Sequence, residues 1–142
     1  MLRKIISTAV FEALNWKMIH EELTYKIRGA IYTVFAELGP GLFESVYEKA
    51  LLCELQSMGL SVMSQVPIRA VYKGKDLDLG FRIDLIVEDQ VLIEIKSIEN
   101  LANVHKKQML TYLRLSGIRV GLLVNFNSML IQDGKSLFRI VN

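Results

Sequence analysis

Hydrophobic and polar residues alternate most regularly between Phe81 and Ser97. Two alternating runs there, separated by Glu88-Asp89-Gln90, predict a β-hairpin with a three-residue loop. Folding the hairpin about Asp89 pairs every aliphatic residue on one face with another aliphatic residue. The pairs are Ile83 with Ile95, Leu85 with Ile93, and Val87 with Val91. A two-residue turn would shift the register by one and break these pairs, so we expect the three-residue loop.

The same register sets Asp84 directly opposite Glu94, with Lys96 two residues further along that face. Opposed residues in an antiparallel pair have Cβ atoms roughly 4.5–5.5 Å apart. Two carboxylates at this separation repel each other unless a cation lies between them, and Mg²⁺ is a hard cation that prefers oxygen ligands. The pattern fits a metal site, and it also fits a solvated polar face with a surface salt bridge.

The remaining pattern predicts helices before and after this hairpin. Apolar residues at helical spacing indicate helices over about 1–20, 22–38, 44–58 and 100–116. Further strands are expected over 60–72, 119–125 and 136–141, and Pro67 indicates an edge strand or a bulge in the first of them. We found no repeat or linker, so we expect residues 1–142 to form a single domain with an N-terminal helical extension over 1–20.

Two of these helices carry candidate site residues. Glu44 lies in the first turn of its helix with Tyr47 three residues later, on nearly the same face. Glu44 is also explained by favourable interaction with the helix dipole. In the later helix, Gln108 falls on the predicted core-facing stripe, where an unpaired amide would be costly, and Tyr112 follows at i+4. A hydrogen-bonded core glutamine is the alternative to a site residue. The expected stripe contains Leu101, Val104, Gln108 and Leu115, with Thr111 or Tyr112 between them.

Composition adds constraints on partners. Hydrophobic residues make up 51% of the chain and the mean hydropathy is +0.31, which favours a homo-oligomer. The net charge of +2 does not by itself indicate nucleic-acid binding. Between residues 96 and 119, however, several cations stand against Glu99 alone. They are Lys96, Lys106, Lys107, Arg114 and Arg119.

Cysteine usage and hydropathy exclude several classes of protein. Cys53 is the single cysteine, so neither an internal disulfide nor a cysteine-based zinc cluster can form. Its apolar neighbours predict that it acts as a small buried hydrophobe. No apolar run reaches the roughly 20 residues of a membrane span. Glu12 interrupts the apolar N-terminal stretch and no small-residue cleavage site follows, so we expect a cytoplasmic protein without membrane contact.

Together these residues resemble the PD-(D/E)XK nuclease superfamily, and more closely the small bacterial GxxExxY family. The GxxExxY motif corresponds to Gly41 through Glu44 to Tyr47. The nuclease signature corresponds to Asp84 followed by Glu94-Ile95-Lys96, and a RecB-like motif to Gln108 and Tyr112. The resemblance spans about residues 22–142. The chain departs from it at Phe35, where many relatives carry histidine.

The resemblance implies an α/β fold of restriction-endonuclease type, with a central mixed β-sheet flanked by α-helices. It also implies that Glu44, Asp84 and Glu94 gather a divalent metal ion, Mg²⁺ or Mn²⁺. Lys96 would lie near the attacking water and the scissile phosphate, which makes Asp84, Glu94 and Lys96 the catalytic residues. Supporting or nucleic-acid-contacting roles fall to Gln108, Tyr112 and Tyr47, and basic side chains suited to backbone phosphates are Lys106, Lys107 and Arg114.

The sequence therefore predicts a metal-dependent nuclease that hydrolyses phosphodiester bonds of DNA or RNA. The alternative is a non-catalytic module that keeps the nuclease fold and binds nucleic acid or a protein partner. The opposed carboxylates favour the enzyme, since a scaffold has no need of them. The small size and near-neutral charge favour the module.

Overall fold

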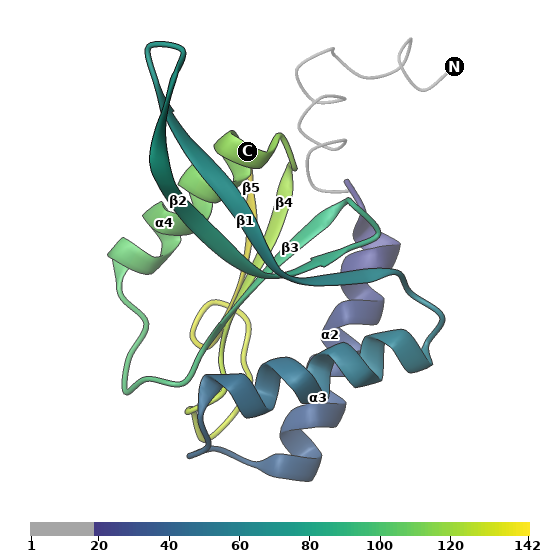
Figure 1. Cartoon of the computed structure of the whole chain (residues 1–142). Helices are drawn as coiled ribbons and strands as arrows, with labels where there is room; N and C mark the ends of the chain where they lie inside the picture. Colours follow the sequence, from purple (N-terminus) through teal and green to yellow (C-terminus); the bar gives the residue numbers. More distant parts are fainter. Residues whose placement is uncertain (1–18) are drawn as a thin grey trace, which may run out of the picture.

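A computed structural model describes residues 19–142 of the chain (Figure 1). The predicted N-terminal helix falls outside the described residues. None of the described helices is long and apolar enough to cross a membrane.

A five-stranded mixed sheet forms the centre of the molecule, with its strands in the order of the sequence. The strands are β1 (Val62–Tyr72), β2 (Lys75–Val87), β3 (Val91–Lys96), β4 (Val120–Asn125) and β5 (Leu137–Val141). Strands β3 and β4 are parallel, and every other neighbouring pair is antiparallel. The parallel pair requires a crossover connection, which α4 (Asn103–Ser116) supplies.

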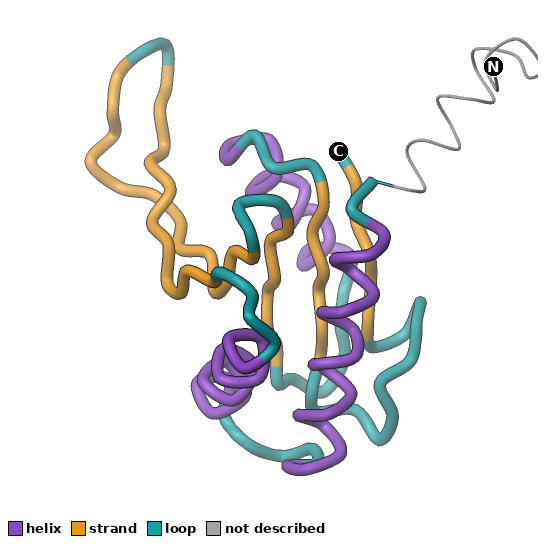
Figure 2. Tube along the Cα trace, turned by 90° about the vertical axis from the view of Figure 1, so that its right-hand side faces the viewer, coloured by secondary structure: helices purple, strands orange, loops and turns teal. Residues whose placement is uncertain are grey.

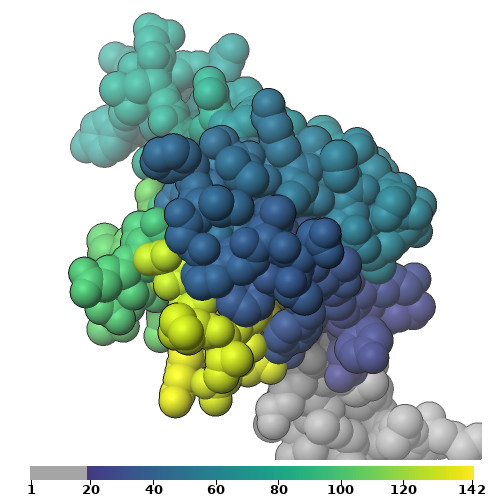
Figure 3. All heavy atoms as spheres, turned by 90° about the horizontal axis from the view of Figure 1, so that it is seen from below, coloured from purple at the N-terminus to yellow at the C-terminus, as the bar shows by residue number. Residues whose placement is uncertain are grey.

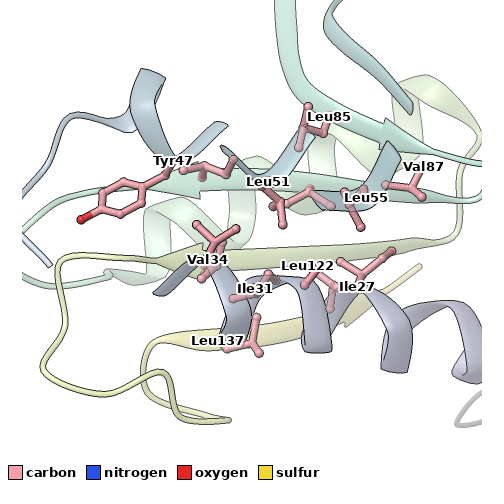
Figure 4. Close-up of a cluster of buried hydrophobic side chains, with 14 of the residues drawn as sticks. Ile27, Ile31, Val34, Tyr47, Leu51, Leu55, Leu85, Val87, Leu122 and Leu137 are labelled. Atoms are coloured by element: carbon pink, nitrogen blue, oxygen red, sulfur yellow. The ribbon is translucent and has the colours of Figure 1, made fainter. Parts of the chain in front are cut away.

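Helices cover both faces of the sheet. Helices α2 (Glu21–Leu38) and α3 (Glu44–Ser57) pack on one face, where their aliphatic side chains meet those of β2, β3 and β4 in the larger buried cluster (Figure 4). Helix α4 packs on the other face over a smaller cluster. The expectation of an α/β fold with a central mixed sheet between helices is confirmed.

The β2–β3 hairpin has the predicted loop and, next to it, the predicted register. Leu85 pairs with Ile93 and Val87 with Val91, and the loop closes with the Gln90 N–H donating to the Val87 carbonyl at 2.9 Å. The expected third pair is wrong, because the ladder ends at Leu85 and Ile83 packs in the cluster under α4. Strand β2 therefore turns away from β3 at Asp84.

Beyond this point β1 and β2 continue together as a two-stranded arm, which we define as residues 69–82. Figures 1 and 2 show the arm projecting away from the body of the domain. It ends in a turn at Lys73 and Gly74, which have φ angles of 48° and 76°. Strand β1 is an edge strand with a register irregularity between Arg69 and Val71, as Pro67 indicated.

Helix α4 presents a different face to the core from the one predicted. It buries Met109, Tyr112 and Leu113, whereas Gln108 is exposed and Val104 is 64% exposed. Leu115 is exposed as well. The reason lies on β4, where a Cβ atom at Gly121 would come within 2.4 Å of the Met109 sulfur. The missing side chain at Gly121 makes the space that Met109 fills.

Cys53 is exposed and is not the small core residue that was expected. Helix α3 buries Tyr47, Leu51 and Leu55. These positions are four residues apart and form one stripe, and Cys53 lies midway between the last two, on the opposite side of the helix.

Candidate active site

Asp84 and Glu94 lie opposite each other at the point where β2 and β3 separate. The Asp84 backbone N–H donates to Glu94 Oε1 at 3.1 Å, and the Ile95 N–H donates to Asp84 Oδ2 at 2.8 Å. Each carboxylate thus accepts a hydrogen bond from the neighbouring strand beyond the end of the ladder. Each bond uses one carboxylate oxygen and leaves the other for a further ligand.

Burial raises the pKa values of this pair above the usual range for carboxyl groups. Glu94 is only 6% exposed, and its burial, followed by the charge of Asp84, raises the pKa of Glu94 to about 8. Burial is also the main reason that the pKa of Asp84 rises to about 6, with Glu48 and Glu44 adding to it. Lys96 lowers both pKa values and the Ile95 amide lowers that of Asp84. The pair is short of positive charge, which a bound cation would supply.

Lys96 ends β3 beside this pair, and the next residue links the strand to α3. The Ser97 N–H donates to Glu44 Oε1 at 3.2 Å, and the Ser97 hydroxyl donates to the Leu42 carbonyl at 2.5 Å. Glu44 therefore connects the first turn of α3 to the end of the strand that carries Glu94 and Lys96. Its charge contributes to the raised pKa values of both Asp84 and Glu94.

The chemistry of these donors fits a hard divalent cation only in part. Two buried carboxylates with raised pKa values and free oxygens are suitable ligands for Mg²⁺ or Mn²⁺. Within residues 19–142, however, no three or more His, Cys, Asp or Glu side chains are grouped so that they could hold one metal ion. Asp84 and Glu94 form a pair, and Glu44, whose charge acts on both, does not join them in such a group.

Tyr47 is a buried structural residue on which the position of Glu44 depends. Its hydroxyl donates to the Gly39 carbonyl at 2.5 Å and accepts from the Leu42 N–H at 3.1 Å. Its ring stacks on Phe126, with centroids 4.4 Å apart. Figure 3 shows α3 beside the segment that follows β4. Tyr47 thus holds the turn that leads into α3.

Helix α4 brings Tyr112 and Gln108 to the edge of the acidic pair. Burial raises the pKa of Tyr112, and the charges of Glu94 and Asp84 add to the rise. Gln108 lies next to the Tyr112 hydroxyl and lowers its pKa. The Phe81 ring, at the base of the arm, lies 5.4 Å from the Tyr112 ring. Gln108 is therefore near the site but exposed, which rules out the interpretation of it as a core glutamine.

The predicted phosphate-binding cations differ in their surroundings. The Lys106 ammonium lies 3.9 Å from the centre of the Phe138 ring, which holds it against β5. Lys107 is exposed, and exposed Arg114 makes a long hydrogen bond of 3.4 Å to Thr111. These three cations lie on α4, which also supplies Gln108 and Tyr112.

Sequence reasoning missed Asn125, which fixes the chain just after Lys96. Its amide donates to the Ile98 carbonyl at 2.9 Å, and its oxygen accepts from the N–H groups of Ile98 and Asn127 at 3.1 and 3.2 Å. It is buried and lies next to Lys96 in the parallel β3–β4 register. A polar residue at the end of the otherwise apolar strand 120–125 was the available signal.

Sequence reasoning also missed Glu48 and Gln65, which lie near Asp84. Glu48, one turn after Glu44, accepts a 2.6 Å hydrogen bond from Gln65 and raises the pKa of Asp84. Gln65 stands opposite Asp84 between two paired positions of β1 and has a left-handed φ of 53°. Residues other than glycine seldom adopt this conformation, so β1 bends where β2 turns away from β3.

Comparisons with known proteins assign the chain to a family. A sequence model of the PD-(D/E)XK nuclease superfamily matches residues 21–137. No curated protein matches the sequence. Among solved structures, the crystal structure of SSO0001 is similar with a TM-score of 0.53 at 23% identity. The match covers 87% of this chain and 59% of that one, so this chain spans less than two thirds of its neighbour, and the likeness shows the fold alone.

The family match includes α3, the β2–β3 hairpin, α4 and β4. The mixed sheet flanked by helices has the restriction-endonuclease-like architecture, and Asp84 and Glu94 face each other where its central strands part. The chain therefore belongs to the PD-(D/E)XK nuclease superfamily.

Proposed function

We propose that this domain is a metal-dependent nuclease of the GxxExxY group that hydrolyses phosphodiester bonds of DNA or RNA. One observation carries the proposal. Asp84 and Glu94 are held together in a partly buried position, with raised pKa values, beside Lys96. Neighbouring acids of this kind cost stability, so a function that needs their charge explains their presence better than a structural role does.

Each residue has a distinct proposed role. Asp84 and Glu94 would hold Mg²⁺ or Mn²⁺ through the carboxylate oxygens that accept no amide hydrogen bond, and Glu44 would complete the set from α3. A divalent cation, when bound, lowers the pKa of a coordinated water and offsets negative charge on the phosphate. Lys96 would place its ammonium group near the attacking water and the scissile phosphate, where it stabilises developing negative charge.

The surrounding residues would position the substrate. Gln108 and Tyr112 line the edge of the pair from α4 and are suited to hydrogen-bond a phosphate or sugar oxygen. The backbone phosphates on either side would meet Lys106, Lys107 and Arg114 in a salt-dependent manner. Tyr47 would support the site indirectly, by holding the turn that presents Glu44.

A specific observation favours the non-catalytic module as a second candidate. The described residues bring two carboxylates together but no group of three that could hold one metal ion. Phe35, in the position where the resemblance leads one to look for histidine, packs against the larger core cluster. In this second function the fold binds nucleic acid or a protein, and no phosphodiester bond is broken.

Incubation with single- and double-stranded DNA and RNA in Mg²⁺ or Mn²⁺ tests the two candidates. We expect cleavage by the parent protein, none by Asp84→Asn or Lys96→Met, and full activity in Asp89→Asn. Asp89 is the matched control, because it is an exposed aspartate in the adjoining hairpin loop. Equal activity in all of these variants would refute the assigned site. Metal-independent binding without cleavage by the parent protein would favour the module.

A further inference from the structure

We propose that the arm, residues 69–82, lies in a groove of double-stranded DNA beside the candidate active site. This inference rests on the proposed function in that both assign nucleic acid to the same side of the domain, and it goes further by naming a DNA duplex as the substrate. Three features of the arm support it: its shape, its charge and its attachment to the site.

The arm has the dimensions of a groove-binding element. Lys75 and Arg82 lie seven residues apart on β2, so the arm is roughly 23 Å long at about 3.3 Å per residue. Every arm residue except Ala70 is exposed, and apart from the contact of Phe81 with Tyr112 at its base we find both faces of the arm open to solvent. A two-stranded β-ribbon fits the major groove of B-form DNA. The major groove of an RNA duplex is deep and narrow and does not admit it.

Contacts between its two strands give the arm a defined conformation. Arg69 and Asp76 form an ion pair across its strands at 2.9 Å. At its base, a Cβ atom on Gly80 would lie 2.0 Å from the Ile68 carbonyl oxygen, so only glycine permits the close approach of the two strands there. These contacts hold the arm together, although a two-stranded hairpin alone is only marginally stable in water.

Charge on the arm is complementary to a polyanion. The arm carries four cations against two aspartates, and one of those aspartates is paired with Arg69. Its tip combines Lys73 and Lys75 with the exposed Tyr72 ring, over which the Lys73 ammonium lies at 5.4 Å. Helix α4 has three lysine or arginine residues and no acid, whereas α2 and α3 together have six glutamates against three cations. Positive charge therefore collects on the arm and α4, and negative charge on α2 and α3.

The base of the arm adjoins the acidic pair. Arg82 precedes Asp84 by two residues on β2, and Phe81 contacts Tyr112. A duplex held along the arm would consequently continue past Tyr112 toward Asp84 and Glu94. The exposed apolar side chains of the arm, Val71, Leu77 and Leu79, are suited to thymine methyl groups, which lie on the floor of the major groove. They are equally suited to a second copy of this chain, and the experiment separates the two partners.

The test measures binding of the whole protein, in EDTA, to a fluorescent DNA duplex of about two helical turns. We expect Lys73→Gln with Lys75→Gln to weaken binding about tenfold or more and to reduce the slope of log K against log salt by about 0.9 per lost contact. The control, Lys26→Gln with Lys49→Gln, removes the same charge from α2 and α3 and should leave binding near that of the parent. An RNA duplex should bind the parent more weakly than the DNA duplex does.

A second measurement separates the arm from the proposed chemistry. Hydrolysis of bis(p-nitrophenyl) phosphate in Mn²⁺ needs the site but not the arm, so the arm variant should keep this activity while Asp84→Asn loses it. If the parent binds DNA through the arm yet hydrolyses no diester, the arm proposal stands and the nuclease proposal fails. Unchanged DNA affinity in the arm variant overturns the arm proposal. A dimer that dissociates on Leu77→Ser with Leu79→Ser, together with equal DNA affinity, also overturns it and assigns the arm to a second copy.

Discussion

The backbone amide of Asp84 donates a hydrogen bond to the carboxylate of Glu94, so the strand that carries one acid binds the side chain of the other. The Asp84 carboxylate is anchored in return by the Ile95 amide. Neither side chain is free to move away from its neighbour to relieve their repulsion. The electrostatic cost of the pair is therefore part of the folded state and is open to measurement.

Stability should fall as the pH rises across the neutral range. The folded-state pKa values of Asp84 and Glu94, about 6 and about 8, lie above their usual values of 3.8 and 4.5. Between about pH 4 and 8 the native state thus binds more protons than the unfolded chain, and the free energy of unfolding decreases with pH. The stabilisation is complete below pH 4 and is lost by about pH 8. Urea unfolding at pH 5 and pH 8 should show a loss on the order of a few kcal/mol in the parent and a smaller loss in Asp84→Asn.

Divalent metal should reverse this loss. Mn²⁺ that binds the ionised native pair more tightly than the unfolded chain raises the melting temperature near neutral pH. Asp84→Asn keeps the shape of the side chain and removes one charge. Without metal this variant should be at least as stable as the parent, and with millimolar Mn²⁺ it should gain much less. Thermal melts in EDTA and in Mn²⁺ measure both effects, and equal gains in the two proteins would show that Asp84 is not a ligand.

Tyr47→Phe should destabilise the fold through a single oxygen atom. The substitution leaves the Gly39 carbonyl and the Leu42 N–H without the hydroxyl that now joins them, at a cost of about 1–3 kcal/mol. Tyr25→Phe is the control, because Tyr25 is 76% exposed and should change stability by less than about 0.5 kcal/mol. Chemical unfolding compares the two. Equal small effects would mean that water replaces the hydroxyl in the turn.

Asn125→Ala should loosen the chain beyond Lys96. It removes three hydrogen bonds of a buried side chain, so we expect a loss of roughly 2–3 kcal/mol and faster amide exchange at Ile98. Asn127→Ala, which removes one 3.3 Å bond from an exposed side chain to the same carbonyl, should lose far less. Similar losses in the two variants would contradict the structural role given to Asn125.

The sequence predicted those parts of the fold that depend on neighbouring residues. Aliphatic pairing alone gave the Leu85–Ile93 register, because a shift by one residue would bring polar side chains into the core. The predicted register failed at Ile83, because the turn of β2 away from β3 depends on residues outside the β2–β3 hairpin, namely on β1 and the left-handed backbone of Gln65.

The prediction of which face of helix α4 is buried was wrong for a related reason. Its sequence contains two apolar stripes offset by one residue, and local periodicity cannot choose between them. The choice is made on β4, where Gly121 admits Met109. The acidic pair was accessible from the sequence because its two members share one hairpin. Glu48 and Asn125 were missed, because the contacts of each with the site form only through tertiary packing.

The order of the strands in the sheet has a consequence for folding. Since each strand lies beside its neighbour in sequence, closing the sheet needs two tight turns, one loop over residues 126–136 and one helical crossover. Pairing strands that are close in sequence costs less chain entropy than pairing distant ones. Asp84, Glu94, Tyr112 and Asn125 all belong to the segment from β2 to β4, which can assemble before α2 and α3 pack onto it. Mutations in that segment should mainly slow folding, and mutations in α2 should mainly speed unfolding, which stopped-flow kinetics can separate. Asp84 and Glu94 would then come into contact early in folding, and their repulsion would act during most of the folding reaction.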